Sequence, residues 1–234
     1  DYRFSFGYQN QEGIVRESGL TKYTARFNGS KKFINDRLNI GTQITVANNL
    51  DDNAPISNNS GFQGDLIGMT LKANPSDSIY SANGKLKQKG VDNANPVALL
   101  QLSKDFTKTL RALGNLSAEY SITNNLSFKT VVGFDQSLSR RKAAYSRDLV
   151  VQTISGLGRL FLNDIETDNR LWENYFTYNK SFNRANLSAV LGYSYQSFEY
   201  ISSGFEMTNF RVSDLDNMIN NFASANQDLG TSII

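Results

Sequence analysis

The stretch Tyr2-Arg3-Phe4-Ser5-Phe6-Gly7-Tyr8 opens the chain with an aromatic residue at every second position. Because successive side chains point to opposite faces of a β-strand, this pattern puts four aromatic residues on one face. The same period of two recurs in six later segments, at 23–28, 38–46, 110–120, 126–138, 172–179 and 187–196. The sequence therefore predicts an all-β protein built from long antiparallel strands.

The connections between these segments alternate in length. Short turns fall near 31–37, 123–125 and 182–186, whereas the connections near 48–105, 146–169 and 204–234 are long and rich in Asn, Ser, Gly and Asp. Bacterial outer-membrane barrels combine short periplasmic turns with long extracellular loops. The pattern favours transmembrane β-barrel strands, with 48–105 as a long extracellular loop. A soluble carbohydrate-binding β-sandwich remains the alternative, since its strands also alternate.

Composition excludes several classes of function. The 234 residues include no Cys and no His, which removes thiol chemistry, disulfides and the commonest general base. The formal net charge is +2 and the basic residues are scattered, so no nucleic-acid surface is expected. The glycines of 156–158 lack the Lys and Ser/Thr of a phosphate loop. We predict no enzymatic activity and no cofactor.

The first residues already read as a strand, with no leader sequence before Tyr2. We therefore interpret the chain as a fragment of a larger mature protein. Its strands, roughly seven in number, are too few to close around a solute-sized channel, and unpaired edges are costly in hydrocarbon. The sequence predicts a curved sheet with open edges, or one part of a larger assembly.

Several segments together resemble one known family. They are Phe6-Gly7-Tyr8-Gln9-Asn10-Gln11-Glu12-Gly13-Ile14-Val15, Lys22-Tyr23-Thr24-Ala25-Arg26-Phe27-Asn28, Asn95-Pro96-Val97-Ala98-Leu99-Leu100, Leu113-Gly114-Asn115-Leu116-Ser117-Ala118-Glu119-Tyr120, Glu173-Asn174-Tyr175-Phe176-Thr177-Tyr178-Asn179-Lys180, Asn186-Leu187-Ser188-Ala189 and Gly192-Tyr193-Ser194-Tyr195-Gln196. In order and spacing they resemble the barrel strands of the SusC/RagA-like TonB-dependent outer-membrane transporters of Bacteroidetes. The resemblance covers the chain from about Phe6 to Gln196.

This resemblance implies a barrel of about 22 strands in the cell outer membrane. It further implies an N-terminal plug, energy from the TonB-ExbB-ExbD complex through a TonB box, a SusD-like surface lipoprotein as lid, and a glycan or peptide ligand. Residues 1–234 would form part of the barrel domain, with plug and TonB box outside this segment. A passive porin or a structural barrel would share the strand pattern and stays open as an alternative.

Alternation divides the strand residues into two predicted faces. The face toward outer-membrane lipid is expected to carry Phe128, Val132, Phe134, Trp172, Phe176, Tyr178, Leu191, Tyr193 and Tyr195. The face toward the lumen is expected to carry Lys129, Asp135, Glu173, Ser188 and Gln196.

Candidate contacts with ligand or partner lie outside the strand centres. Phe62 and Tyr80 in the long loop could stack on sugars or peptide side chains, or could instead hold the loop together. The basic triplet Arg140-Arg141-Lys142 could bind an anionic ligand, a lipopolysaccharide phosphate or the lid, and a solvated strand end is an equal reading. The acidic groups at 51–53 and 214–217 lack the spacing of a calcium loop, so no metal is predicted.

Overall fold

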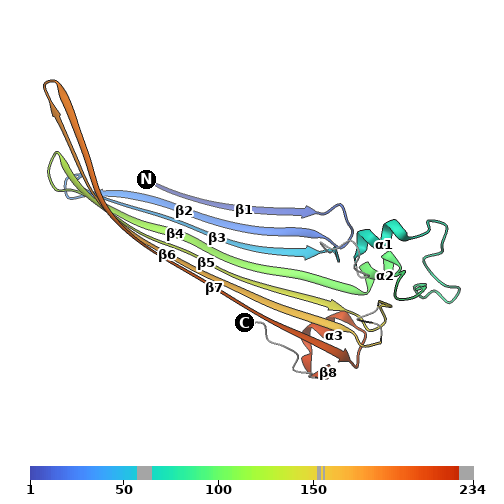
Figure 1. Ribbon diagram of the computed structural model, residues 1–234. Coiled ribbons are helices and arrows are strands. Elements are labelled where there is room, and N and C mark those ends of the chain that lie inside the picture. Colours follow the sequence, from blue (N-terminus) through green and yellow to red (C-terminus); the bar gives the residue numbers. More distant parts are fainter. Residues whose placement is uncertain (57–64, 152–153, 155, 227–234) are drawn as a thin grey trace.

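A computed structural model describes residues 1–56, 65–151, 154 and 156–226 of the chain. Its strands form one antiparallel sheet in which β1 to β8 follow each other in chain order (Figure 1). The strands are β1 (Tyr2–Glu12), β2 (Gly19–Phe33), β3 (Leu38–Asn53), β4 (Ser103–Ser121), β5 (Leu126–Tyr145), β6 (Arg159–Phe182), β7 (Ala185–Phe210) and β8 (Ala225–Asn226). The helices are α1 (Leu66–Lys72), α2 (Pro96–Gln101), α3 (Leu215–Asn220) and the 3-10 helix Phe222–Ser224.

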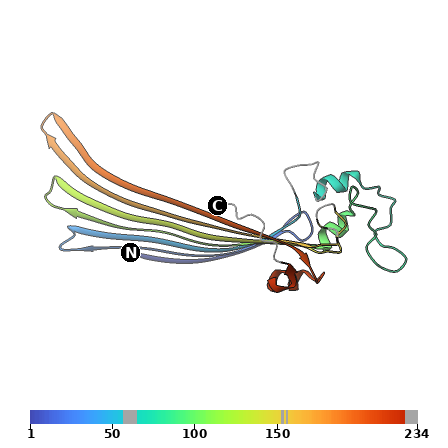
Figure 2. The ribbon, with the colours of Figure 1, turned by 60° about the horizontal axis from the view of Figure 1, so that its bottom comes forward.

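The sheet is open. Its strand order is linear, so β1 and the two-residue β8 are its edges, as the strand count predicted. Figure 2 shows the strands bending together as one curved sheet, with the short turns at one end and the helices at the other. All eight strands belong to this sheet, so the described residues do not form the two packed sheets of a sandwich. No helix among the described residues is long and apolar enough to cross a membrane.

The short turns occur where the sequence predicted them. The connection from β2 to β3 places Ile34, Asn35 and Asp36 in the left-handed region, with φ of 54°, 53° and 64°. In the connection from β4 to β5, the Thr123 hydroxyl accepts hydrogen bonds from the backbone N–H groups of Asn125 (3.2 Å) and Leu126 (3.0 Å). Such local side-chain bonds stabilise tight turns without further packing.

The strands are longer than predicted at the opposite end, which corrects the expected loop bounds. The expected connections 48–105 and 146–169 shrink to 54–102 and 146–158, and β7 continues to Phe210. The reason is visible in β3, where Asp51 and Asp52 are both polar although they lie on opposite faces. Backbone ladders continue there without an apolar face, so period two no longer marks the strand.

Two small cores lie at this loop end. The first joins α1, α2 and the connection 146–158 through Leu66, Met69, Ala94, Ala98, Leu99, Leu149, Val151 and Ile154. The second packs α3 against the sheet through Ala144, Leu160, Phe210, Met218 and Ile219. Each of the three α-helices begins at a side-chain cap, with Asp65 before α1, Asn95 before α2 and Asp214 before α3. The structure thus joins a long sheet to a compact group of loops.

Candidate functional site: a two-faced wall and its loop platform

Strand register places all nine residues predicted to face lipid on one face of the sheet. Cross-strand partners share a face, and the partner rows connect Phe128 with Phe176 and Leu191, and Val132 with Trp172 and Tyr195. Phe134, Tyr178 and Tyr193 have the same strand parity. Five members of the set keep at least 48% of their surface exposed. We call this the apolar face.

Neighbouring rings on the apolar face pack against each other rather than into a core. Phe128 and Phe176 lie with ring centroids 4.8 Å apart, and Trp172 meets Tyr193 edge to face at 6.3 Å. The aromatic residues of the opening strand belong to the same face, because Tyr2, Phe4, Phe6 and Tyr8 pair with odd-numbered residues of β2. The apolar face therefore runs across all seven long strands.

Charges bound the apolar face along β6. The Lys180 ammonium lies over the Phe182 ring. Lys180 and Arg170 both lie on the apolar face and are ten residues apart in β6 (180 minus 170). Between them this face carries Trp172, Phe176 and Tyr178, with Asn174 as the one polar residue. Ten strand residues rise ~33 Å, which at a tilt of ~40° spans ~25 Å, the height of the apolar band of outer-membrane barrels.

The five residues predicted to face the lumen lie on the opposite, polar face. Between β5 and β6, Lys129 pairs with Tyr175 and Asp135 pairs with Asn169. Between β6 and β7, Glu173 pairs with Ser194, Leu171 with Gln196, and Asn179 with Ser188. The Arg111 guanidinium donates to both Asp135 oxygens, at 2.8 Å and 2.6 Å. This bidentate pair orders two charged side chains on a face that also carries hydroxyl groups, amide groups and further charges such as Lys129 and Glu173.

The polar face also carries two aromatic residues that alternation did not single out. Phe198 and Tyr200 pair with Asn169 and Thr167, which places them on the polar face, and they are 75% and 65% exposed. The signal was present in the sequence, because the aromatic positions of β7 switch from odd numbers at Tyr193 and Tyr195 to even numbers here.

Three connections at the loop end are bonded into one body, which we call the loop platform: the described residues of 54–102, 146–158 and 211–224. The Gln88 side chain donates to the Asp148 carbonyl and accepts from the Val150 N–H, both at 2.7 Å. The Ser146 hydroxyl donates to the Ser213 carbonyl at 2.7 Å, and its N–H donates to Leu102 O at 2.8 Å. Loops from three hairpins are thus held by shared hydrogen bonds.

A buried carboxylate marks the junction between wall and platform. Asp105 is 7% exposed on the polar face and accepts from the Arg141 guanidinium, with Nε 3.0 Å from Oδ1, and from the Asn53 amide at 3.2 Å. This hydrogen bond raises the pKa of Arg141 further above its usual range. Burial, followed by the charge of Asp105, raises the pKa of Tyr145, which packs against the platform core.

The structure separates the predicted basic triplet. Arg141 lies on the polar face with Asp105, whereas Arg140 and Lys142 lie on the apolar-face side beyond the aromatic band. Arg140 pairs with Asp164 at 2.8 Å, and Lys142 donates to the Ile219 carbonyl of α3 at 3.4 Å. The three cations therefore do not form one anion site.

The other sequence candidates lie in or near the platform. Tyr80 is 47% exposed and forms an isolated β-bridge with Leu86, whereas Phe62 lies outside the described residues. The acidic group at 214–217 has structural partners, since Asp214 caps α3 and Asp216 pairs with Lys104 at 2.6 Å. Within the described part of the chain, no group of three acidic residues is arranged to hold a metal ion.

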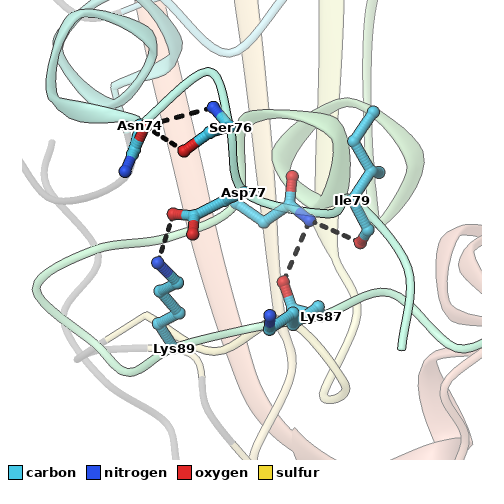
Figure 3. Close-up of polar contacts among 7 residues, drawn as sticks. Asn74, Ser76, Asp77, Ile79, Lys87 and Lys89 are labelled. Carbon is cyan, nitrogen blue, oxygen red and sulfur yellow. Dashed lines mark hydrogen bonds and ion pairs between the residues drawn. The ribbon is translucent and has the colours of Figure 1, made fainter. Parts of the chain in front are cut away.

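Figure 3 shows the polar contacts around a pocket of about 240 Å³ in the platform, between the C-terminal end of α1 and the residue that caps α2. Asn74 Oδ1 accepts from the N–H and the hydroxyl of Ser76, at 3.1 Å and 2.8 Å. The Asn95 amide donates to the carbonyls of Ile79 (3.1 Å) and Lys87 (3.0 Å), and Lys89 pairs with Asp77. Sequence reasoning missed this pocket, because it depends on contacts between residues up to sixteen positions apart.

Comparison with known proteins gives related sequences but no matching protein-family model. TonB-dependent receptor P3 of Formosa agariphila is 31% identical over 202 residues, which are 85% of this chain and 20% of that protein. TonB-dependent receptor SusC of Bacteroides thetaiotaomicron is 28% identical over 142 residues, 51% of this chain and 14% of SusC. The chain thus spans a fifth or less of the length of these curated relatives.

Solved structures share the fold. A chain of the RagAB peptide transporter superposes with a TM-score of 0.73 and 22% identity, over 92% of this chain and 24% of that one. The RagAB peptide importer in its closed-closed state gives a TM-score of 0.70 at 21% identity. The fold defines a segment of the wall of a larger antiparallel β-barrel. With the sequence relatives, the chain is identified as a SusC/RagA-like segment of the β-barrel of a TonB-dependent receptor.

Proposed function

We propose that the chain forms part of the wall and outer loops of an outer-membrane, TonB-dependent importer of a nutrient such as an oligosaccharide or peptide. The observation that carries the proposal is the separation of the two faces, with Lys180 and Arg170 bounding an apolar face of β6 that spans a height of about 25 Å. The similarity to two TonB-dependent receptors supports the energy source. Such a wall works without an enzymatic step or a cofactor of its own.

In this proposal each face has a separate task. The residues from Phe128 to Tyr195 on the apolar face contact membrane lipid, while the polar face lines the path of the solute. Hydroxyl, amide and charged groups suit a hydrated lumen, because they replace the hydrogen bonds that a polar solute gives up on entry. Further strands of the full-length protein would pair with the open edges, and residues 1–234 would be one part of the barrel domain.

Recognition is assigned to the extracellular side, where the loop platform lies. There Tyr80 and Phe62 would contact ligand or partner. Arg140, Arg141 and Lys142 would do so separately, because they lie on different faces of the sheet. The similarity to SusC and to the RagAB peptide importer supports a SusD-like surface lipoprotein as that partner. The TonB-ExbB-ExbD complex would act through a plug and TonB box outside this segment.

The test is uptake by the full-length protein in cells with and without TonB. Labelled oligosaccharides and peptides are offered to a strain that expresses the protein and to a matched strain that lacks TonB. We expect uptake of at least one class to require both proteins. Uptake that is independent of TonB and proportional to concentration would instead establish a passive porin, and failure of the purified protein to enter lipid vesicles would remove the membrane wall altogether.

A further inference from the structure

The platform pocket is preorganised by its own hydrogen bonds. Both N–H donors of the Asn95 amide hold neighbouring chain segments, through Ile79 and Lys87, and its oxygen accepts from the Val97 N–H at 2.9 Å. The ion pair of Asp77 and Lys89 joins the same two segments at the rim. A pocket held open in this way binds without first ordering its walls, which lowers the entropic cost of binding.

The pocket's size and lining favour one aliphatic side chain. Its volume of about 240 Å³ lies below the roughly 300–1,000 Å³ of sites for whole small molecules. Apolar side chains line it, among them Ala73, Pro75, Ile79 and Val97, and no described lining residue is aromatic. Sugar rings are usually held by stacking on aromatic side chains, so this lining suits an amino-acid side chain better than a glycan.

The rim is positively charged. The charged residues that line the pocket are two Lys (Lys87 and Lys89) and one Asp (Asp77), a net charge of +1 (two minus one). Lys89 is paired with Asp77, whereas Lys87, which also lines the pocket, forms no ion pair within the described chain. Lys85 lies on the same small hairpin but does not line the pocket. An apolar hollow beside an uncompensated cation is complementary to an apolar group that carries an anion.

We infer that this pocket binds the C-terminal residue of an extracellular peptide, with an aliphatic side chain in the hollow and the terminal carboxylate at Lys87. The inference rests on the proposed import function and narrows its ligand to peptides with a free, apolar C-terminal residue. A charge-assisted bond to the carboxylate and burial of one Leu side chain would each contribute about tenfold in affinity.

The experiment measures binding by calorimetry to the purified full-length protein. The probes are Gly-Gly-Leu with a free carboxylate, its C-terminal amide, Gly-Gly-Gly and maltotriose. We expect the free acid of Gly-Gly-Leu to bind about tenfold more tightly than either the amide or Gly-Gly-Gly. Lys87→Gln should remove the difference between acid and amide, whereas the matched control Lys85→Gln should keep it. Ala73→Phe, which fills the hollow, should weaken Gly-Gly-Leu without changing heat-modifiable folding.

Three results would overturn the inference: equal binding of acid and amide, equal losses in Lys87→Gln and Lys85→Gln, or maltotriose binding that responds to the same variants. Its failure is distinguishable from failure of the import function. TonB-dependent uptake retained without peptide binding at the pocket refutes only the pocket's role. Peptide binding that responds to Lys87→Gln in a protein whose uptake ignores TonB refutes only the importer.

Discussion

The wall and the loop platform are stabilised in different ways. In the wall, few side chains are buried, and order comes from backbone ladders and from rings such as Phe128 and Phe176 that pack along the surface. In the platform, Met69 and Leu99 are fully buried and side-chain amides such as Gln88 bond to the backbone of other loops. The wall therefore depends on its surroundings to satisfy the apolar face, whereas the platform contains its own core.

The largest expected effect tests the two faces of the wall directly. Val131 and Val132 are neighbours on β5 but lie on the polar and the apolar face, respectively. Val132→Arg should cost about 2–4 kcal/mol of stability if this position lies near the middle of the membrane. Val131→Arg should cost much less, because its side chain can reach water. Urea unfolding of the full-length protein in lipid vesicles measures both, and equal losses would contradict the assignment of faces.

A smaller effect is expected at the junction of wall and platform. Asp105→Ala removes the acceptor for Arg141 and Asn53, and we expect a loss of about 1–3 kcal/mol because these donors lose a partner that is itself buried. The comparison variant is Asp164→Ala, which removes the partner of the exposed Arg140 and is itself far less buried than Asp105, with 32% of its side chain exposed. Exposed ion pairs contribute little. If Asp164→Ala destabilised the protein as much as Asp105→Ala in the same urea titration, burial would not be the cause.

The same contrast explains how much could be predicted from sequence. Between Lys180 and Arg170 one face of β6 is apolar, so the alternation of apolar and polar residues located the strand. It also put Trp172 and Phe176 on one face, and the strand register agrees. Beyond Arg170 the apolar-face positions Asp168, Glu166 and Asp164 are charged. The pattern disappears there although the ladder continues, and the predicted loop bounds were accordingly wrong.

Residues of the platform could not be placed from periodicity at all. Gln88 and Asp148 are sixty positions apart, and the sequence contains no local feature that pairs them. The basic triplet is divided for a simpler reason, because adjacent strand residues point to opposite faces, so Arg141 lies apart from Arg140 and Lys142. The start of α2 was not predicted either, although Asn95 followed by Pro96 is a helix-start signal.

A third prediction concerns the platform alone. Gln88→Ala removes two 2.7 Å hydrogen bonds to the connection 146–158, which should cost about 1–2 kcal/mol locally. Hydrogen exchange should accelerate in 146–151 while the strands keep their protection. Lys85→Ala on the same hairpin provides the control. Uniformly faster exchange in wall and platform would show that the two regions are not separately stabilised.

The smallest expected effect tests whether the wall has any stabilising contact that needs neither membrane nor core. Thr123 bonds two backbone N–H groups in the turn from β4 to β5, at the end of the sheet opposite the platform. Thr123→Ala should cost about 0.5–1.5 kcal/mol, because it leaves these donors to water at an exposed turn. Thr123→Ser keeps the hydroxyl and should restore most of the loss. The two variants are compared by urea unfolding in vesicles, with hydrogen exchange of the platform as the second readout.

A loss of protection in the platform would show that the two ends of the sheet are coupled through the strands. A Thr123→Ser variant as unstable as Thr123→Ala would mean that the methyl group of Thr123, and not its hydroxyl, stabilises the turn.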